Sequence, residues 1–388
     1  MFQYQQQQTY FAQVAGGFDE PAADELRELG AKEIHNAFRG MYFKADQPTL
    51  YRINYQARLP ARVLAPLITF DCHSAKYLHR TAVRLDWQQL MAVTDTFAVQ
   101  AAVSATPSLK HSQFAALTVK DAVCDYFREK CGRRPNVDTR NPDLGLHLFV
   151  RNNRATISVD VSGGSLHKRG YRLASVAAPL QETLAAAIIR LSGWDGTKPL
   201  MDPMCGSGTL LGEAVMHYCR IPAGFLRDKW GFRCLPDYSE KDWLAVKSAA
   251  DEAIRPLAAG LLSGGDIQRD ALRAARRNLA ELLTASGTGE ADLREVNLSC
   301  RDFRQMEKLS NTVIMVNPPY GVRLGERDEA EGLLKEFGDF LKQRCTGCTA
   351  FVYVGDSKLL KKVGLKPAWK KELNNGGLEG VLGKFDLY

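Results

Sequence analysis

The residues with the clearest chemical potential form a glycine-rich turn near the middle of the chain. A short apolar run leads into this turn, which reads Asp202-Pro203-Met204-Cys205-Gly206-Ser207-Gly208-Thr209. Its two glycines allow a tight bend and a close approach of the backbone to a ligand. The turn lacks the third glycine of a dinucleotide fingerprint and the lysine of a phosphate loop, so a pyrophosphate is not the expected ligand. The pattern favours S-adenosylmethionine, with Asp202 holding its ammonium group or serving the turn itself.

Two further acidic residues follow apolar runs that resemble short strands. Asp266 precedes Ile267, and Asp302 precedes Phe303. Because the carboxyl ends of parallel strands meet at one edge of a sheet, we expect both pairs beside the glycine turn. Asp266 is expected to accept hydrogen bonds from the ribose hydroxyls, and Asp302 from the adenine amino group. The alternative is that each acid is a helix cap or turn residue.

A second motif, Asn317-Pro318-Pro319-Tyr320, leaves a buried-looking strand about a hundred residues later. The exocyclic nitrogen of a nucleobase is a poor nucleophile because its lone pair is conjugated with the ring. The side-chain oxygen of Asn317 and the backbone oxygen of Pro318 can accept its hydrogens, and the prolines hold these acceptors in place. Tyr320 offers a face on which a flipped base can stack. The motif therefore predicts methyl transfer to a planar amine, and the alternative is an ordinary proline-rich loop.

The second half of the chain alternates short apolar runs with longer amphipathic segments. This alternation predicts a parallel sheet with helices on both faces, closed by an antiparallel hairpin in residues 367–388. The expected strands are 199–202, 261–266, 295–298, 312–317 and 350–354. The expected helices are 179–193, 208–219, 240–258, 269–284 and 329–344.

The first half reads as two smaller α/β units, with a boundary at Ser162-Gly163-Gly164-Ser165 before the second half. The expected helix 112–131 has a predicted buried stripe of Phe114, Leu117, Ala122, Val123 and Phe127. Other expected elements are a helix at 19–29, a hairpin at 34–44, a helix at 47–56 and strands at 62–70, 97–104, 144–150 and 155–161.

Composition and charge narrow the class of protein. The 388 residues are 45% hydrophobic and 24% charged, with a net charge of +7, which is typical of a globular chain. Residues 51–165 carry 15 basic and 9 acidic side chains, an excess compatible with a polyanionic partner. We expect no membrane span, signal peptide or metal site, and the nine scattered cysteines fit reduced thiols in the cytoplasm. Cys345 and Cys348 are expected to be structural because no further ligands complete a metal set.

With these motifs, the chain resembles the amino-methyltransferases, which carry N-P-P-Y or D-P-P-Y loops. The segments 167–172 and 178–186 resemble those before the glycine turn in bacterial 23S ribosomal RNA guanine-N2 methyltransferases. The resemblance implies a Rossmann-like class I methyltransferase domain (166–388), preceded by a ferredoxin-like unit (1–50, with part of the following segment) and a THUMP RNA-binding domain (51–165). Some relatives fuse a second domain that makes N7-methylguanosine, an activity that this resemblance does not imply.

The resemblance and the local charges also mark residues outside the two motifs. Thr183 is implied to line the cofactor pocket, whereas Gln268 stands where many relatives have a second acid. The residues expected to contact RNA are Lys130, Arg133, Arg134, Lys168, Arg169 and Arg172. For the last three, the alternative is a solvated charged face.

The expected function is therefore transfer of a methyl group from S-adenosylmethionine to guanine N2 in 23S ribosomal RNA or a large-subunit precursor. Three alternatives remain open at this point. They are a tRNA guanine-N2 methyltransferase, an adenine-N6 DNA methyltransferase, and an RNA-binding assembly factor with a vestigial methylation centre.

Overall fold

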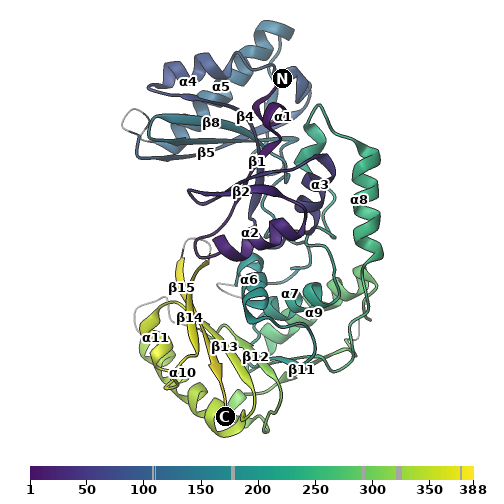
Figure 1. The fold of residues 1–388 in the computed structure, drawn as a ribbon, viewed down its shortest axis with the longest axis vertical. Coiled ribbons are helices and arrows are strands. Elements are labelled where there is room, and N and C mark those ends of the chain that lie inside the picture. Colours follow the sequence, from purple (N-terminus) through teal and green to yellow (C-terminus); the bar gives the residue numbers. More distant parts are fainter. Residues whose placement is uncertain (107–108, 110, 176–179, 291–292, 320–325, 376–377) are drawn as a thin grey trace.

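The computed structural model shows an upper and a lower lobe, with the long helix α8 (Glu240–Glu252) running along one side (Figure 1). It describes every residue except 107–108, 110, 176–179, 291–292, 320–325 and 376–377. The N-terminal part of the chain builds the upper lobe, and the C-terminal part builds the lower one. Over the described ranges, no helix combines the length and the apolar character needed to cross a membrane.

One eight-stranded sheet runs through the upper lobe, in the order β2-β3-β1-β4-β8-β7-β5-β6. Strand β4 is its junction, because it pairs antiparallel with β1 on one side and with β8 on the other. The two expected α/β units therefore share a continuous sheet, and the domain ranges 1–50, 51–165 and 166–388 stay a prediction. The strands are β1 Thr9–Gln13, β2 Lys32–Ala37, β3 Gly40–Lys44, β4 Arg62–Asp71, β5 Thr96–Ser104, β6 Asn136–Val137, β7 Leu144–Arg151 and β8 Arg154–Asp160.

The helices of the upper lobe lie outside this sheet, with α4 and α5 above the strands and α2 below them in Figure 1. Helix α5 buries its Ala115, Val119 and Phe127 side chains. Phe114 and Leu117 are exposed instead, so the prediction that they belong to the buried stripe is wrong. The helices are α1 Gln3–Gln7, α2 Asp19–Glu28, α3 Gln47–Gln56, α4 Ala75–Ala82 and α5 Ser112–Cys131, and a short 3-10 turn covers Trp87–Gln89.

The lower lobe contains a seven-stranded sheet in the order β11-β10-β9-β12-β13-β15-β14. The first five strands are parallel, and β15 and β14 form an antiparallel hairpin at the edge. This arrangement confirms the predicted Rossmann-like fold with its closing hairpin. The strands are β9 Leu200–Asp202, β10 Leu262–Asp266, β11 Val296–Cys300, β12 Val313–Val316, β13 Thr349–Val354, β14 Trp369–Asn375 and β15 Leu378–Asp386.

Helices cover both faces of the lower sheet because its central strands are apolar on both sides. Ile314 and Val316 of β12 pack in the cluster that contains Phe337, whereas Met315 packs in the cluster that contains Leu211. The helices are α6 Glu182–Ser192, α7 Thr209–Tyr218, α8, α9 Arg269–Ser286, α10 Glu326–Arg344 and α11 Ser357–Lys361. Short 3-10 turns cover Gly231–Cys234 and Phe303–Gln305.

A cluster of aromatic rings joins the two lobes. Tyr51 and Tyr55 of α3 meet Phe232 and Trp243, with ring centroids 4.8 Å apart for Tyr51–Phe232 and 5.3 Å apart for Tyr55–Trp243. Trp230 packs on Trp243 at 5.7 Å. Such ring pairs contribute about 0.5–1.5 kcal/mol each beyond their area burial. The upper lobe is therefore anchored to the lower one by a packed core.

Candidate active site

A pocket of about 340 Å³ lies at the carboxyl ends of β9, β10 and β12. Ligands bind at this edge in open α/β sheets because the loops that leave the strands converge there. The pocket brings together most residues that the sequence predicted for the site. These are Asp202, Pro203, Met204, Cys205, Gly206, Ser207, Thr209, Asp266, Ile267, Asp302, Phe303, Asn317 and Pro319.

Three of the predicted residues that the structure describes are not in the pocket wall, and a fourth lies outside the described residues. Gly208 lies behind the turn as the residue before α7, and Pro318 is buried. Thr183 is buried in α6 and is not among the lining residues, so its expected role in the pocket stays a prediction. Tyr320 lies outside the described residues, so its predicted stacking role stays a prediction.

The glycine turn holds its shape through backbone conformation and backbone hydrogen bonds. Gly206 and Gly208 have φ angles of 54° and 81°, in the left-handed region that favours glycine. The Gly206 amide donates to Oδ2 of Asp266 at 2.9 Å, and the Cys205 amide donates to the Gly265 carbonyl at 2.8 Å. These bonds join the turn after β9 to the end of β10. The turn therefore keeps its shape through bonds within the protein.

Asp202 is the most strongly perturbed acid of the pocket. It is almost fully buried, and one carboxylate oxygen accepts a hydrogen bond from the Met204 amide at 3.1 Å. Burial raises the pKa of Asp202 to about 8, the Met204 hydrogen bond lowers it, and the nearby charge of Asp266 raises it further. A cation placed beside this carboxyl group would favour its ionised form. Asp202 is thus suited to hold the ammonium group of a bound ligand.

Asp266 and Asp302 both line the pocket and both hold neighbouring backbone. The Oδ1 atom of Asp266 accepts from the Gln268 amide at 2.8 Å. Asp302 accepts from the Arg304 amide at 2.9 Å and pairs with the Arg304 guanidinium at 2.7 Å. Both acids therefore stabilise the turn that follows them, which is the alternative role that the sequence left open. Each carboxylate oxygen retains a second lone pair, so binding of ribose or adenine is compatible with these bonds.

Two polar atoms of the pocket region are buried and have no partner among the described residues. They are the Oγ atom of Ser207 and the Oδ1 atom of Asn317. A buried polar atom without a hydrogen bond costs about 1–3 kcal/mol, so such atoms often indicate a ligand position. The glycine turn, the Asp202 carboxyl group and these two atoms fit an adenosyl cofactor beside an amine-bearing acceptor.

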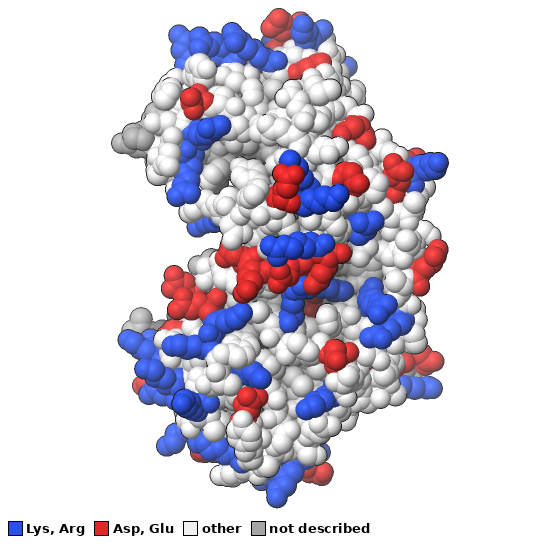
Figure 2. All heavy atoms as spheres, viewed as in Figure 1, with Lys and Arg blue, Asp and Glu red and all other residues white. Residues whose placement is uncertain are grey.

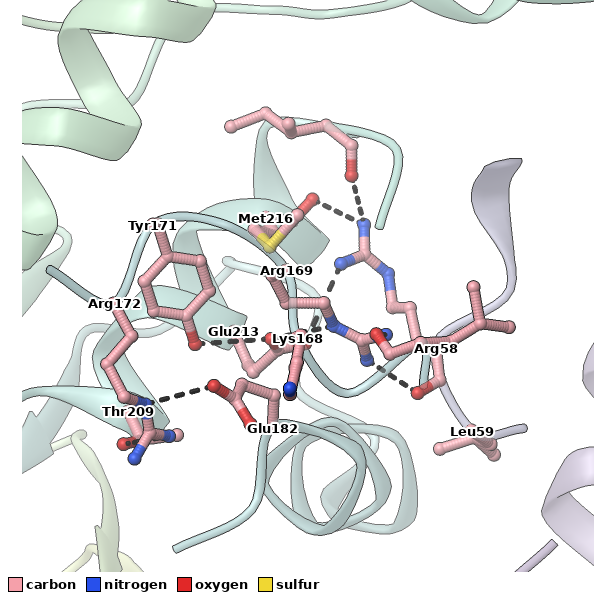
Figure 3. A network of polar contacts seen from close by, with 12 residues as sticks. Arg58, Leu59, Lys168, Arg169, Tyr171, Arg172, Glu182, Thr209, Glu213 and Met216 are labelled. Carbon is pink, nitrogen blue, oxygen red and sulfur yellow. Dashed lines mark hydrogen bonds and ion pairs between the residues drawn. The ribbon is translucent and has the colours of Figure 1, made fainter. Parts of the chain in front are cut away.

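Two predicted RNA contacts, Arg169 and Arg172, are held by partners within the protein, and Arg169 is not available to phosphate. Arg169 is buried, with its Nε atom 3.3 Å from Glu213 and its Nη2 atom donating to the Arg58 carbonyl at 2.6 Å (Figure 3). Arg172 pairs with Glu182 at 2.9 Å and donates to Thr209 Oγ1 at 3.1 Å. The prediction that Arg169 contacts RNA is therefore wrong, whereas Arg172 is half-buried and its RNA contact stays a prediction. They brace α7, the helix that begins at the glycine turn.

The other four predicted RNA contacts are exposed. Lys130, Arg133 and Arg134 lie at and after the end of α5, and Lys168 lies in the segment between the lobes. Figure 2 shows basic side chains at the top of the upper lobe and an acidic band across the middle of the molecule. The exposed positions are compatible with phosphate contacts, and their role stays a proposal.

The pocket also contains residues that the sequence did not single out for the site. The wall includes Leu180, Leu210, Ala271, Arg301, Arg304 and Leu333. Behind it, buried Asn278 of α9 donates to the Ser207 carbonyl at 3.0 Å and accepts from the amides of Leu173 and Ala174. In the sequence, the role of Asn278 is indicated only by the presence of a polar residue within the expected helix 269–284. Asn278 fixes the turn to the segment that precedes α6.

Comparisons with known proteins agree with this geometry. Family models match as "RMKL-like, methyltransferase domain" over residues 169–384, "THUMP domain" over 72–160 and "RlmL ferredoxin-like domain" over 9–64. A Synechocystis sp. protein named "Putative RNA methyltransferase slr0064" is 37% identical over 98% of this chain and 97% of its own length. The "Ribosomal RNA large subunit methyltransferase K/L" of Syntrophotalea carbinolica is 38% identical, and the alignment covers 97% of this chain and 53% of that protein. This chain thus spans about half the length of its K/L relatives.

Solved structures show the same architecture. The structure described as "SMU.472, a putative methyltransferase complexed with SAH" has a TM-score of 0.83 at 28% identity, with 98% of both chains covered. A possible methylase from Clostridium difficile 630 has a TM-score of 0.81 at 25% identity, again with 98% of both chains covered. The pocket, the family models and these relatives agree. The chain belongs to the RMKL-like family of S-adenosylmethionine-dependent methyltransferases.

Proposed function

We propose that this chain transfers a methyl group from S-adenosylmethionine to the exocyclic N2 of a guanine in large-subunit (23S) ribosomal RNA. The observation that carries the proposal is the buried, unpartnered Oδ1 atom of Asn317 in the wall of the pocket that contains the glycine turn. An amide oxygen in this position is an acceptor without a donor. The exocyclic amine of a flipped guanine supplies that donor.

The proposed chemistry depends on positioning and electrostatics rather than on a general base. Bound S-adenosylmethionine supplies an electrophilic methyl group. Asn317 Oδ1 and the Pro318 carbonyl accept the hydrogens of the amine, which loosens the conjugation of its lone pair with the ring. Pro318 and Pro319 keep the two acceptors fixed, and Tyr320 provides the stacking face. The turn residues 202–209 with Asp266, Ile267, Asp302 and Phe303 hold the cofactor, and the methylated amine loses its extra proton to water.

The choice of guanine in ribosomal RNA is supported by the relatives. The K/L relatives are named as ribosomal RNA large subunit methyltransferases, and a THUMP family model matches the upper lobe. The exposed Lys130, Arg133, Arg134 and Lys168 supply positive charge for RNA phosphates. A cytoplasmic location is expected from such a substrate. Among the described residues, no cluster of ligand-type side chains could hold a metal ion, and the proposed reaction needs none.

Nucleoside analysis tests this proposal directly. The purified chain is incubated with labelled S-adenosylmethionine and large-subunit RNA from cells that lack the enzyme, and the RNA is then digested. We expect label in N2-methylguanosine, with tRNA transcripts and duplex DNA as competing acceptors in parallel reactions. Label in N6-methyladenosine, or transfer to tRNA or DNA in preference to ribosomal RNA, would refute the assignment. RNA binding with no transfer to any acceptor would favour an assembly factor.

Cofactor affinity should depend on pH through Asp202. In the free protein its pKa of about 8 keeps the carboxyl group protonated at pH 7, whereas an ammonium ligand favours the carboxylate. Affinity should therefore rise by up to about tenfold per pH unit toward pH 8. It should fall again as the cofactor's own α-amino group, with a pKa of about 7.7–8.0, loses its charge. Titration calorimetry between pH 6 and 9 measures this profile.

The Asp202→Asn variant is the control for this titration. It should lose the rising limb and keep the falling one, because only the cofactor then titrates. Linkage gives a second readout without cofactor: the pKa is raised from 3.8 to about 8 on folding, so this group's contribution to stability should fall as pH rises between these values. Identical pH profiles for the two proteins would show that Asp202 does not hold the ammonium group.

A further inference from the structure

A second pocket, of about 230 Å³, lies against the sheet of the upper lobe. Strands β1, β3, β4, β5, β7 and β8 and the β2–β3 turn all contribute to its wall. The pocket shares no lining residue with the active site. It is smaller than the roughly 300–1,000 Å³ of pockets that bury a whole small molecule, so it suits one ring system of a larger ligand.

Phe38, Phe149 and Arg39 line one side of this pocket, and Arg151 lies beside them against the Phe38 ring. Phe38, in the β2–β3 turn, stacks on Phe149 of β7 with ring centroids 6.1 Å apart and an interplanar angle of 21°. The guanidinium of Arg151 lies 4.2 Å from the Phe38 ring centroid, and that of Arg39 lies 5.5 Å from it. Phe38 is 39% exposed, although a large aromatic ring is normally buried. Neither arginine has an ion-pair partner within the described part of the chain.

The rest of the wall offers hydrogen bonds without negative charge. It includes no Asp or Glu, and its polar groups come from residues such as His147, Thr156 and Ser158. The Nδ1 atom of His147 is buried and has no partner among the described residues. Burial, and then the charge of Arg62, lowers the pKa of His147 to about 4, so the ring is neutral at pH 7 and has one donor and one acceptor nitrogen.

We propose that this pocket binds an unpaired nucleotide of single-stranded RNA, with its base stacked on the Phe38–Phe149–Arg151 cluster and its phosphates beside Arg39 and Arg151. Bases stack on aromatic rings and on guanidinium planes, and sequence-specific RNA recognition usually targets such unpaired nucleotides. The inference rests on the proposed function, since it gives the substrate RNA a second contact away from the methylated guanine. A duplex would hold its bases out of reach of so narrow a pocket.

The positive charges of Arg39 and Arg151 favour RNA over a protein partner. An apolar peptide would gain from the phenylalanines, but it would leave both arginines without a counter-charge. A nucleotide supplies the ring and the phosphate together, so it matches both halves of the cluster. A single-stranded nucleic acid therefore matches both the aromatic rings and the two arginines.

Fluorescence binding with a single-stranded RNA decamer tests the site. A central 2-aminopurine reports stacking by loss of its emission, and the same decamer annealed to its complement is the duplex arm. The wild-type chain should bind the single strand and quench the probe. Phe38→Leu and Phe149→Leu should weaken this binding by roughly 5- to 150-fold, the range measured when a base loses its aromatic partner. Arg151→Gln should weaken it as well and reduce its dependence on salt.

The matched control is Phe114→Leu, which changes an exposed phenylalanine on α5 of the same lobe. It should bind like wild type, and unfolding midpoints verify that all variants fold. Equal binding by wild type and the Phe38 and Phe149 variants, or loss only in the Phe114 variant, would overturn the site. A preference for the duplex would do the same. If the chain methylates ribosomal RNA but does not quench the 2-aminopurine of the single strand, this inference is refuted and the proposed function stands. If the chain quenches the probe but methylates no RNA, the proposed function is refuted and the binding site stands.

Discussion

Replacing Asn317 with alanine is expected to lower the rate of methyl transfer by about 10²–10³-fold, the cost of removing one preorganised hydrogen-bonding group from a reacting centre. The side-chain oxygen of Asn317 is buried at the pocket and has no partner among the described residues, so its removal breaks no hydrogen bond that is described. Its removal should therefore leave stability nearly unchanged. Cofactor binding should also persist, because the glycine turn and its acids lie on other strands. Single-turnover transfer and calorimetric cofactor binding measure the two effects separately.

Two control variants sharpen this prediction. Asn317→Asp keeps an acceptor oxygen and should retain more activity than the alanine variant. Asn297→Ala removes an exposed asparagine from β11 and should leave both transfer and binding intact. Full activity in Asn317→Ala would mean that the amine is activated by another group. Loss of cofactor binding together with activity would mean that Asn317 supports the pocket rather than the reaction.

The sequence predicted the lower lobe well because its physical signals are local. Parallel strands buried on both faces read as short apolar runs, and the glycine turn and Asn317 follow two of them directly. Sheet topology then brings the strand ends together, which is why residues as distant as Asp202 and Asn317 line one pocket. Thr183 was expected there from resemblance alone, and it is buried in α6 outside the pocket wall, so that role stays a prediction.

In the upper lobe, the prediction missed elements whose polar and apolar residues form no clear pattern. Strand β1 was missed, since Thr9–Gln13 does not alternate clearly between polar and apolar residues. Tyr10 and Ala12 point into the core, whereas Phe11 lines the second pocket on the other face. The helix α5 was located correctly, but its buried face consists largely of small residues such as Ala115 and Ala122. Large apolar residues dominate the prediction of a buried helix face, so Phe114 was assigned to the wrong face.

The RNA-contacting residues were the least well predicted, because a basic residue in a sequence does not show whether it pairs with an acid of the same chain. Lys168 and Arg169 are neighbours, yet Lys168 is exposed and Arg169 is buried against Glu213, which lies 44 residues later. The ionic cluster of Arg58, Arg169 and Glu213 lies between the lobes (Figure 3). Arg58 follows α3 of the upper lobe and donates to the carbonyls of Met216 and Ile221, both at 2.7 Å. The cluster therefore ties the upper lobe to the helix that carries the glycine turn.

Neutralising the carboxylate of this cluster is expected to be the most destabilising single change that we predict. In Glu213→Gln, the buried guanidinium of Arg169 loses its counter-charge, and Arg58 loses a charge 3.9 Å away. Breaking a buried ion pair by removing one partner costs about 3–5 kcal/mol. The Tyr171 hydroxyl, 3.3 Å from Glu213 Oε1, would lose a charged acceptor as well. The free energy of unfolding from urea titration should fall by that amount, and the unfolding midpoint should fall with it.

A double-mutant cycle separates the ion pair from general damage to the core. Arg169→Gln alone should also destabilise, because it weakens bonds to the Leu166 and Arg58 carbonyls. The double variant should lose less than the two single losses together, since it leaves no unpaired charge between these positions. Glu129→Gln, at an exposed position of α5, should change stability by no more than about 0.5 kcal/mol. Additive losses would contradict a coupled pair and would assign the effect of Glu213 to packing of α7 alone.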